Sequence, residues 1–142
     1  MSIHVEVKID VILHATENQD KVFDSFLEVF DIKRENFYIQ NLTGHFDNPI
    51  TLASTNLKKE SAKSFVIKFF DVINTTDFDK IYKNIEECIS NSSLKLKISK
   101  QEMISGNIVL EDKDAIKITM TCPVYVKKDS KKIYQQLFQL GK

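Results

Sequence analysis

The segment Ser2–His14, "SIHVEVKIDVILH", alternates apolar and polar side chains at every position except Ile12. One side of the alternation is aliphatic and the other is mostly polar, which is typical of a β-strand that buries one face and exposes the other. The aliphatic side consists of Ile3, Val5, Val7, Ile9, Val11 and Leu13. The segment therefore predicts a long strand with one face in the core, around which the rest of the fold is built.

Further segments place apolar residues at helical spacing. They are residues 22–30, 58–73, 78–89 and 130–138. Thr16 and Gln19 have the chemistry of a capping box ahead of the first segment. Ser99 and Glu102 have the same chemistry ahead of a shorter helical turn, which Gly106 is expected to end.

Short runs of aromatic, aliphatic and β-branched residues predict the remaining strands. They are residues 36–41 and 50–55, read as one hairpin, residues 94–98, and residues 107–110 and 115–122, read as a second hairpin. The elements do not form the long βα alternation of a parallel sheet, so we predict the α+β class. The expected architecture is two-layer, a largely antiparallel sheet with helices packed on one face, in the order β-α-β-β-α-α-β-(α)-β-β-α.

Composition predicts one domain spanning residues 1–142, because 42% hydrophobic residues and ten phenylalanines can fill a core at this length. The formal net charge is zero, but it is unevenly distributed. Residues 1–56 carry four basic residues against nine acidic ones, whereas residues 57–142 carry sixteen lysines against eleven acids. Only a local basic surface could therefore attract a polyanion.

Several function classes are disfavoured by missing patterns. Cys88 and Cys122 lack the spacing of a zinc site and are expected to be buried free thiols. No catalytic or nucleotide-binding motif occurs, so we expect a protein that is not an enzyme and has no cofactor and no metal. The charged N-terminus and the lack of a long apolar run predict a cytoplasmic protein with no membrane partner.

If helices cover one face of the sheet, the alternate residues of every strand line the other face. Lys95, Lys97, Lys117 and Tyr38 are among them. Lysines beside a planar aromatic side chain can bind nucleic acid, because the ammonium groups neutralise phosphates and a base stacks on the ring. The alternative is a solvated face with scattered lysines, and the residues by themselves favour that alternative.

The loop "NLTGHFDNPI", residues 41–50, leaves two interpretations open. Gly44 permits a left-handed backbone and Pro49 pushes Asn48 into an extended conformation, which together account for a well-made turn. Alternatively, His45 and Asn48 donate hydrogen bonds to a ligand from this loop.

Three stretches resemble an archaeal RNA-binding family predicted to supply an exosome subunit. They are "HATENQDKVFDSF" (residues 14–26), "GHFDNPI" (residues 44–50) and "KISKQEMISGNIVLEDKDAIKI" (residues 97–118). Together they carry an Ala-Thr-Glu followed by Lys-Val, a Gly-x-x-x-Asn-Pro loop, and a Lys-Gln with a glycine five residues on. The matching positions are Thr16, Glu17, Lys21, Gly44, His45, Asn48, Pro49, Lys100, Gln101 and Gly106. Asp47 departs from the pattern, because the family loop usually has a second glycine there.

The resemblance implies a small non-catalytic RNA-binding domain, similar to double-stranded RNA-binding or ribosomal-protein folds, that serves an exosome-like complex. On this hypothesis the RNA-binding residues are Lys58, Lys59, Lys63, Lys95, Lys97, Lys100, Lys117, Tyr38, His45 and Asn48. The alternative hypothesis is a protein-interaction module that forms a homodimer or docks to a larger complex, because an exposed sheet edge and unlike charged halves both permit assembly.

Overall fold

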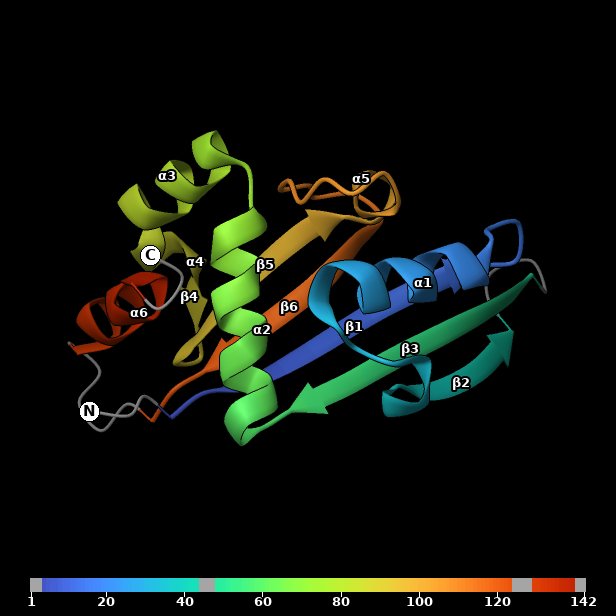
Figure 1. Ribbon diagram of the computed structural model, residues 1–142, viewed down its shortest axis with the longest axis horizontal. Helices are drawn as coiled ribbons and strands as arrows, with labels where there is room; N and C mark the ends of the chain where they lie inside the picture. Colours follow the sequence, from blue (N-terminus) through green and yellow to red (C-terminus); the bar gives the residue numbers. More distant parts are fainter. Residues whose placement is uncertain (1–3, 44–47, 124–128, 140–142) are drawn as a thin grey trace.

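The computed structural model describes residues 4–43, 48–123 and 129–139. Its first layer is a six-stranded sheet in the order β2-β3-β1-β6-β5-β4, in which every pair of neighbouring strands is antiparallel (Figure 1). The strands are β1 (Glu6–His14), β2 (Tyr38–Thr43), β3 (Pro49–Leu57), β4 (Ile89–Ser90), β5 (Ser93–Ser99) and β6 (Ala115–Thr121). The strand predicted from residues 2–14 lies inside the sheet, between β3 and β6.

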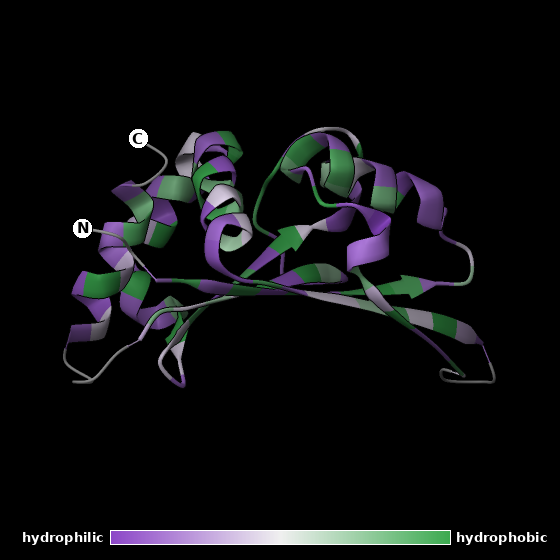
Figure 2. Cartoon of the chain, turned by 60° about the horizontal axis from the view of Figure 1, so that its bottom comes forward, coloured by the Kyte–Doolittle hydropathy of each residue, from purple (hydrophilic) through white to green (hydrophobic). Residues whose placement is uncertain are grey.

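Helices form the second layer and gather on one side of the sheet, leaving the other side open (Figure 2). They are α1 (Gln19–Phe30), the 3-10 turn η1 (Arg34–Asn36), α2 (Lys59–Val72), α3 (Thr75–Lys83), α4 (Ile85–Cys88), α5 (Lys100–Ile104) and α6 (Ser130–Phe138). The predicted α+β class with helices on one sheet face is confirmed. None of the helices in the described ranges has the length and apolar character needed to cross a membrane.

The core lies between the two layers. The buried face of β1 carries Val7, Ile9, Val11 and Leu13, each no more than 2% exposed. Phenylalanines of α1 and α2 cover this side of the sheet and contact each other, with the rings of Phe30 and Phe65 4.7 Å apart. Burial of a valine, leucine, isoleucine or phenylalanine side chain stabilises the fold by roughly 1.5–3 kcal/mol. Burial of the apolar faces predicted from the sequence therefore explains why the helices pack on the sheet.

Local capping agrees with the sequence at one helix and differs at another. The Ser99 hydroxyl accepts a hydrogen bond from the Glu102 N–H at 3.1 Å, and Gly106 has φ +89°, as predicted for α5 and its end. The predicted Thr16 cap of α1 is wrong, because the Asn18 side chain accepts from the Lys21 N–H instead. Asn18 directly precedes the helix, so its side-chain oxygen takes the capping role that the hydroxyl of Thr16 was expected to fill.

The predicted second hairpin, residues 107–110 with 115–122, is wrong. β6 pairs with β5 and β1, whereas Leu110 bridges to Ile98 on the opposite side of β5. The Ser99 N–H donates to the Val109 carbonyl at 2.9 Å, and this contact holds the segment at the outer side of β5. The segment therefore lies on the same side of β5 as the short strand β4. β6 lies on the other side of β5, between β5 and β1, and is an interior strand.

Candidate nucleic-acid interface

The open face of the sheet arranges side chains in rows that run across the strands, because paired residues in an antiparallel sheet point to the same side. The observed register defines two neighbouring rows. The first row is Lys97, Lys117, Asp10, Ser54 and Tyr38, and the second is Lys95, Thr119, Lys8 and Asn56. The two rows bring together side chains from five strands that lie far apart in the sequence.

Four lysines of these rows form a cluster, which we call the sheet lysines: Lys8, Lys95, Lys97 and Lys117. All four are exposed, and within the described part of the chain none of their ammonium groups makes an ion pair. Lys97 and Lys117 are direct cross-strand partners, an arrangement that like charges make unfavourable. The cluster is therefore a place where an anion such as a phosphate relieves repulsion.

Tyr38 stands at the other end of the same row as Lys97, on the edge strand β2. Its side chain is 67% exposed, and it borders a hollow of about 330 Å³ on the open face. Four strand spacings separate the row's ends, or about 19 Å at roughly 4.8 Å per spacing. A stretch of several nucleotides can therefore reach both the ring and the lysines.

A second basic group lies where α2 begins, around a hollow of about 780 Å³. Lys58, Lys59 and Lys63 line it, together with Glu6 and Thr121, which face each other across β1 and β6. That pair adjoins the row that contains Lys8, so the second group continues the basic surface around the end of the sheet.

Cys122 also lines this second hollow, at its buried side. Burial raises the pKa of its thiol to about 12, so the group stays protonated near neutral pH and is a poor nucleophile. Burial together with the charge of Glu87 also raises the pKa of Cys88. Both cysteines are free thiols.

Lys100 does not belong to the exposed surface, and its predicted place among the phosphate contacts is corrected. Its side chain is 1% exposed, and its ammonium donates to the Ile12 carbonyl at 2.6 Å, to Glu17 Oε1 at 2.8 Å and to Asp114 Oδ1 at 3.1 Å. Since Glu17 and Lys100 are both positions of the family resemblance, that part of the resemblance corresponds to an ion pair inside the fold.

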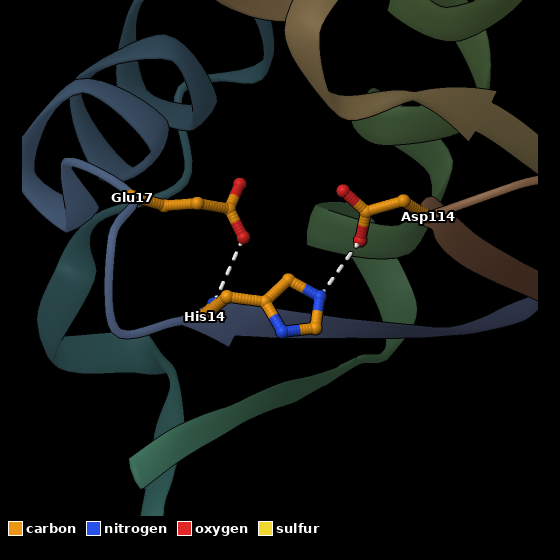
Figure 3. A group of neighbouring side chains, drawn as sticks. All are labelled: His14, Glu17 and Asp114. Atoms are coloured by element: carbon orange, nitrogen blue, oxygen red, sulfur yellow. Dashed lines mark hydrogen bonds and ion pairs between the residues drawn. The ribbon is translucent and has the colours of Figure 1, made fainter. Parts of the chain in front are cut away.

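Figure 3 shows two of these partners, Glu17 and Asp114, together with His14; the three approach from the turn after β1, the segment before β6 and the end of β1. Their potential ligand atoms lie within 4.8 Å of one another. His14 Nε2 lies 3.2 Å from Asp114 Oδ1, and the His14 N–H donates to Glu17 Oε1. Lys100 already supplies the positive charge between the two carboxylates, so a metal ion would have to displace it.

The hairpin loop is described only in part. His45, with Gly44 and Asp47, lies outside the described residues, whereas Asn48 is exposed directly before β3. β2 and β3 pair from Tyr38 with Ser54 to Thr43 with Pro49, which confirms the predicted hairpin. Asn48 therefore lies at the far end of the open face from Lys58 and Lys59.

The sequence placed Lys8 on the open face, but neither Lys8 nor Asp10 was named among the RNA-binding residues, and Asp114 was not expected in the buried cluster. Lys8 and Asp10 lie on the polar side of the alternation in β1, which was a sufficient signal for their face but not for their neighbours. Asp114, with φ 48°, gave no such signal, because its approach to Glu17 depends on the path of the chain around α5.

Comparison with known proteins supplies the family. The sequence model of a family described as RNA binding matches residues 6–122. This chain belongs to that RNA-binding family. A curated relative, the uncharacterized protein MJ0213 of Methanocaldococcus jannaschii, is 23% identical over 139 residues that cover 92% of this chain and 93% of the relative.

Solved structures of archaeal proteins share the fold. Protein AF2318 from Archaeoglobus fulgidus has a TM-score of 0.80 at 22% identity, covering 94% of this chain and 99% of that chain. Protein SSO0741 from Sulfolobus solfataricus has a TM-score of 0.75 at 22% identity, covering 94% and 98%. The resemblance to an archaeal RNA-binding family is thus confirmed at the level of the family and its fold.

Proposed function

We propose that this protein is a non-catalytic RNA-binding protein that contacts the phosphate backbone through the sheet lysines. Membership of the RNA-binding family supports RNA as the ligand. The observation that carries the choice of surface is the direct opposition of Lys97 and Lys117 on a sheet face that none of the described helices covers. Phosphates are the anions that RNA presents in series, and a series of lysines matches them.

The second basic group extends this surface, with Lys58, Lys59 and Lys63 as further phosphate partners. Lys58 caps α2 without a side-chain hydrogen bond, so the first N–H groups of the helix add to the positive potential there. Glu6 and Glu60 also border the hollow, so we expect its contribution to be smaller than that of the sheet lysines. Asn48, and His45 in the loop before it, are proposed as outer contacts.

The absence of catalysis is part of the proposal. Both thiols have raised pKa values, which disfavours a cysteine nucleophile. Glu17 and Asp114 bind the Lys100 ammonium, and His14 contacts Asp114. These side chains therefore connect α5 to β1 and have a structural role. Incubation of labelled RNA with the protein and Mg²⁺ should therefore leave the RNA intact; a cleaved product would contradict this.

Charge reversal tests the binding surface. Lys95→Glu together with Lys97→Glu should weaken binding to every RNA sequence by a similar factor, because both side chains contact phosphates. The matched control is Lys68→Glu together with Lys80→Glu, which changes the net charge equally on the helical layer. Fluorescence anisotropy with single- and double-stranded RNA at two salt concentrations measures both; equal affinity of the two double variants would exclude the sheet face.

We further propose that the protein is an accessory subunit of an exosome-like RNA-processing complex, on the basis of the family resemblance. Mixing the purified protein with a purified archaeal exosome and separating the mixture by size should move the protein into the complex fraction. Ribonuclease treatment distinguishes direct docking, which persists, from tethering through RNA. Free protein in both cases would contradict the proposal.

A specific observation favours a second candidate function, a protein-interaction module that forms a homodimer. β2 is an edge strand whose six residues are all exposed and uncharged, and exposed Ile39 and Leu42 lie on it. Natural edges are usually protected by charges or proline. Sedimentation across a salt series should show a dimer that Ile39→Lys with Leu42→Lys dissociates and Leu27→Lys, on exposed α1, does not. A monomer at every salt concentration would remove this function.

A further inference from the structure

The 330 Å³ hollow beside Tyr38 has the features of a site for one nucleobase. It lies between β1, β2 and β3 on the open face, beside two of the sheet lysines. The lining residues on which the argument rests are Lys8, Asp10, Ile12, Tyr38, Ser54 and Lys117. We propose that this hollow binds an unpaired guanine base of single-stranded RNA, an inference that rests on the proposed RNA-binding function.

The shape of the hollow follows from the size of the residues in its row. Ser54 lies between Asp10 and Tyr38, and its small side chain leaves space between two larger neighbours. Asp10 and Tyr38 are two strand spacings apart, or roughly 10 Å, which leaves room for a planar base about 3.4 Å thick. The volume lies at the lower end of the range for small-ligand sites, as expected for a single base.

Tyr38 provides the stacking surface. Side chains on a strand stand roughly perpendicular to the sheet, and this side chain is 67% exposed on an uncovered edge. Exposed Ile12 and half-buried Leu52 face each other in the following row and line the same hollow, so they give it an apolar side. Sequence-specific RNA proteins bind unstacked bases on such aromatic surfaces, whereas bases in a duplex have their edges paired.

Asp10 selects the base. Its carboxylate makes no hydrogen bond or ion pair with any described residue, although it lies opposite Lys117 in the sheet. A carboxylate only accepts hydrogen bonds and repels phosphate, so its partner in bound RNA is a donor, which RNA supplies on base edges and at the ribose 2′-hydroxyl. Guanine has two neighbouring donors, N1–H and the N2 amino group, on one edge, and these match the two oxygens of a carboxylate.

Lys8 and Lys117 complete the site from the side of the sheet lysines. Both line the hollow and flank Asp10, the first on the same strand and the second directly across. Phosphates on either side of the bound nucleotide can therefore reach a lysine while the base occupies the hollow. This arrangement combines non-specific affinity from the lysines with base selection from Asp10 and Tyr38.

A test compares short uridine oligonucleotides that contain one guanosine, one inosine or one adenosine at the centre. Inosine lacks only the N2 amino group, so it removes one of the two donors. Anisotropy should show about tenfold weaker binding of the inosine oligonucleotide than of the guanosine one, because one hydrogen bond to a charged acceptor is lost. In Asp10→Asn, affinity for plain uridine RNA should be unchanged or higher, while the guanosine preference over inosine should vanish.

Stacking is tested on the same oligonucleotides. Tyr38→Ala should weaken the guanosine oligonucleotide roughly ten- to hundredfold, and Tyr38→Phe should restore binding because the ring remains. Tyr38 is exposed, so neither variant should affect folding, which circular dichroism checks. A wild-type protein that binds the guanosine, inosine and adenosine oligonucleotides equally, or an Asp10→Asn variant that keeps the preference, would overturn the proposal.

The charge-reversed variant separates this inference from the proposed function. If Lys95→Glu with Lys97→Glu abolishes binding but Tyr38→Ala has no effect, RNA binding through lysines stands and the base site is wrong. If duplex RNA binds as tightly as the single strand with one guanosine, the base site is equally wrong. If no RNA binds to the wild-type protein, both fail together.

Discussion

Lys100 and Glu17 are 83 residues apart in the sequence, and their side chains form an ion pair of 2.8 Å inside the fold. The Lys100 side chain is 1% exposed and that of Glu17 is 13% exposed. The same ammonium contacts the Ile12 carbonyl and Asp114, so a single residue connects β1, the turn before α1 and the segment before β6. Lys100 therefore holds these three segments together at one end of the sheet.

Lys100→Met is expected to destabilise the protein by about 3 kcal/mol, because it leaves the mostly buried carboxylate of Glu17 without its partner. Urea unfolding followed by circular dichroism measures the change in the free energy of unfolding. Lys97→Met, at an exposed position three residues earlier on β5, should change it by less than about 0.5 kcal/mol. If the two variants unfolded at the same urea concentration, the ion pair would have no stabilising role.

Tyr134 makes a comparable connection between α6 and the turn before β5. Its hydroxyl donates to the Ser92 carbonyl at 2.5 Å and accepts from the Cys122 N–H at 3.1 Å, and the residue is fully buried. Tyr134→Phe should therefore cost about 2 kcal/mol in the free energy of unfolding, since the buried Cys122 N–H and the part-buried Ser92 carbonyl lose their partner. Tyr82→Phe, at a 38% exposed ring, is the control and should be close to neutral. An equal effect of the two would show that water replaces the lost hydroxyl.

Much of the fold was predictable because alternation and helical spacing report which side of an element is buried. The one-sided burial of β1 and the amphipathic α2 helix follow from that signal. The turn residues between two short strand-like runs indicated the β2–β3 hairpin. The second hairpin failed because periodicity says nothing of which strands are neighbours. Leu110 has a strand-like context, but its backbone partner is Ile98, on the side of β5 away from β6.

The interface was predictable to the same extent. Lys95, Lys97 and Lys117 alternate with buried residues, so their common face could be read, but the opposition of Lys97 and Lys117 required the register. The position of Lys100 in the sequence also indicates burial, a signal that the prediction of the interface did not use. Lys100 continues the series of alternate residues that contains buried Leu96 and Ile98, whereas the exposed lysines before it lie at the positions in between. Its partners Glu17 and Asp114 depend on tertiary contact and could not be read.

Cys122 should make the stability of the protein depend on pH in the alkaline range. Burial raises its pKa to about 12 in the folded state, compared with about 8.5 for an exposed thiol. Between these values the unfolded chain loses the proton and the folded chain keeps it, so the contribution is complete below about pH 8.5 and is lost as the pH rises toward 12.

The free energy of unfolding of the wild type should fall by about 1 to 2 kcal/mol more than that of Cys122→Ala between pH 8 and pH 10. Urea unfolding of both proteins at the two pH values measures this difference, and the comparison cancels groups common to both. Parallel pH dependences would show that the thiol ionises in the folded state.

The salt dependence of RNA binding should report the number of phosphates that the sheet lysines neutralise. Each neutralised phosphate of single-stranded RNA contributes about 0.7 to the slope of log affinity against log salt concentration, so four contacts give a slope of about −2.8. Lys8, Lys95, Lys97 and Lys117 are replaced with glutamine cumulatively, and each added substitution should make the slope less steep by about 0.7. Lys68→Gln and Lys80→Gln, on the helical layer, should leave the slope unchanged. A quadruple variant that keeps the wild-type slope would place the phosphate contacts elsewhere on the molecule, because counterion release follows the cations that meet the backbone and not the net charge of the protein.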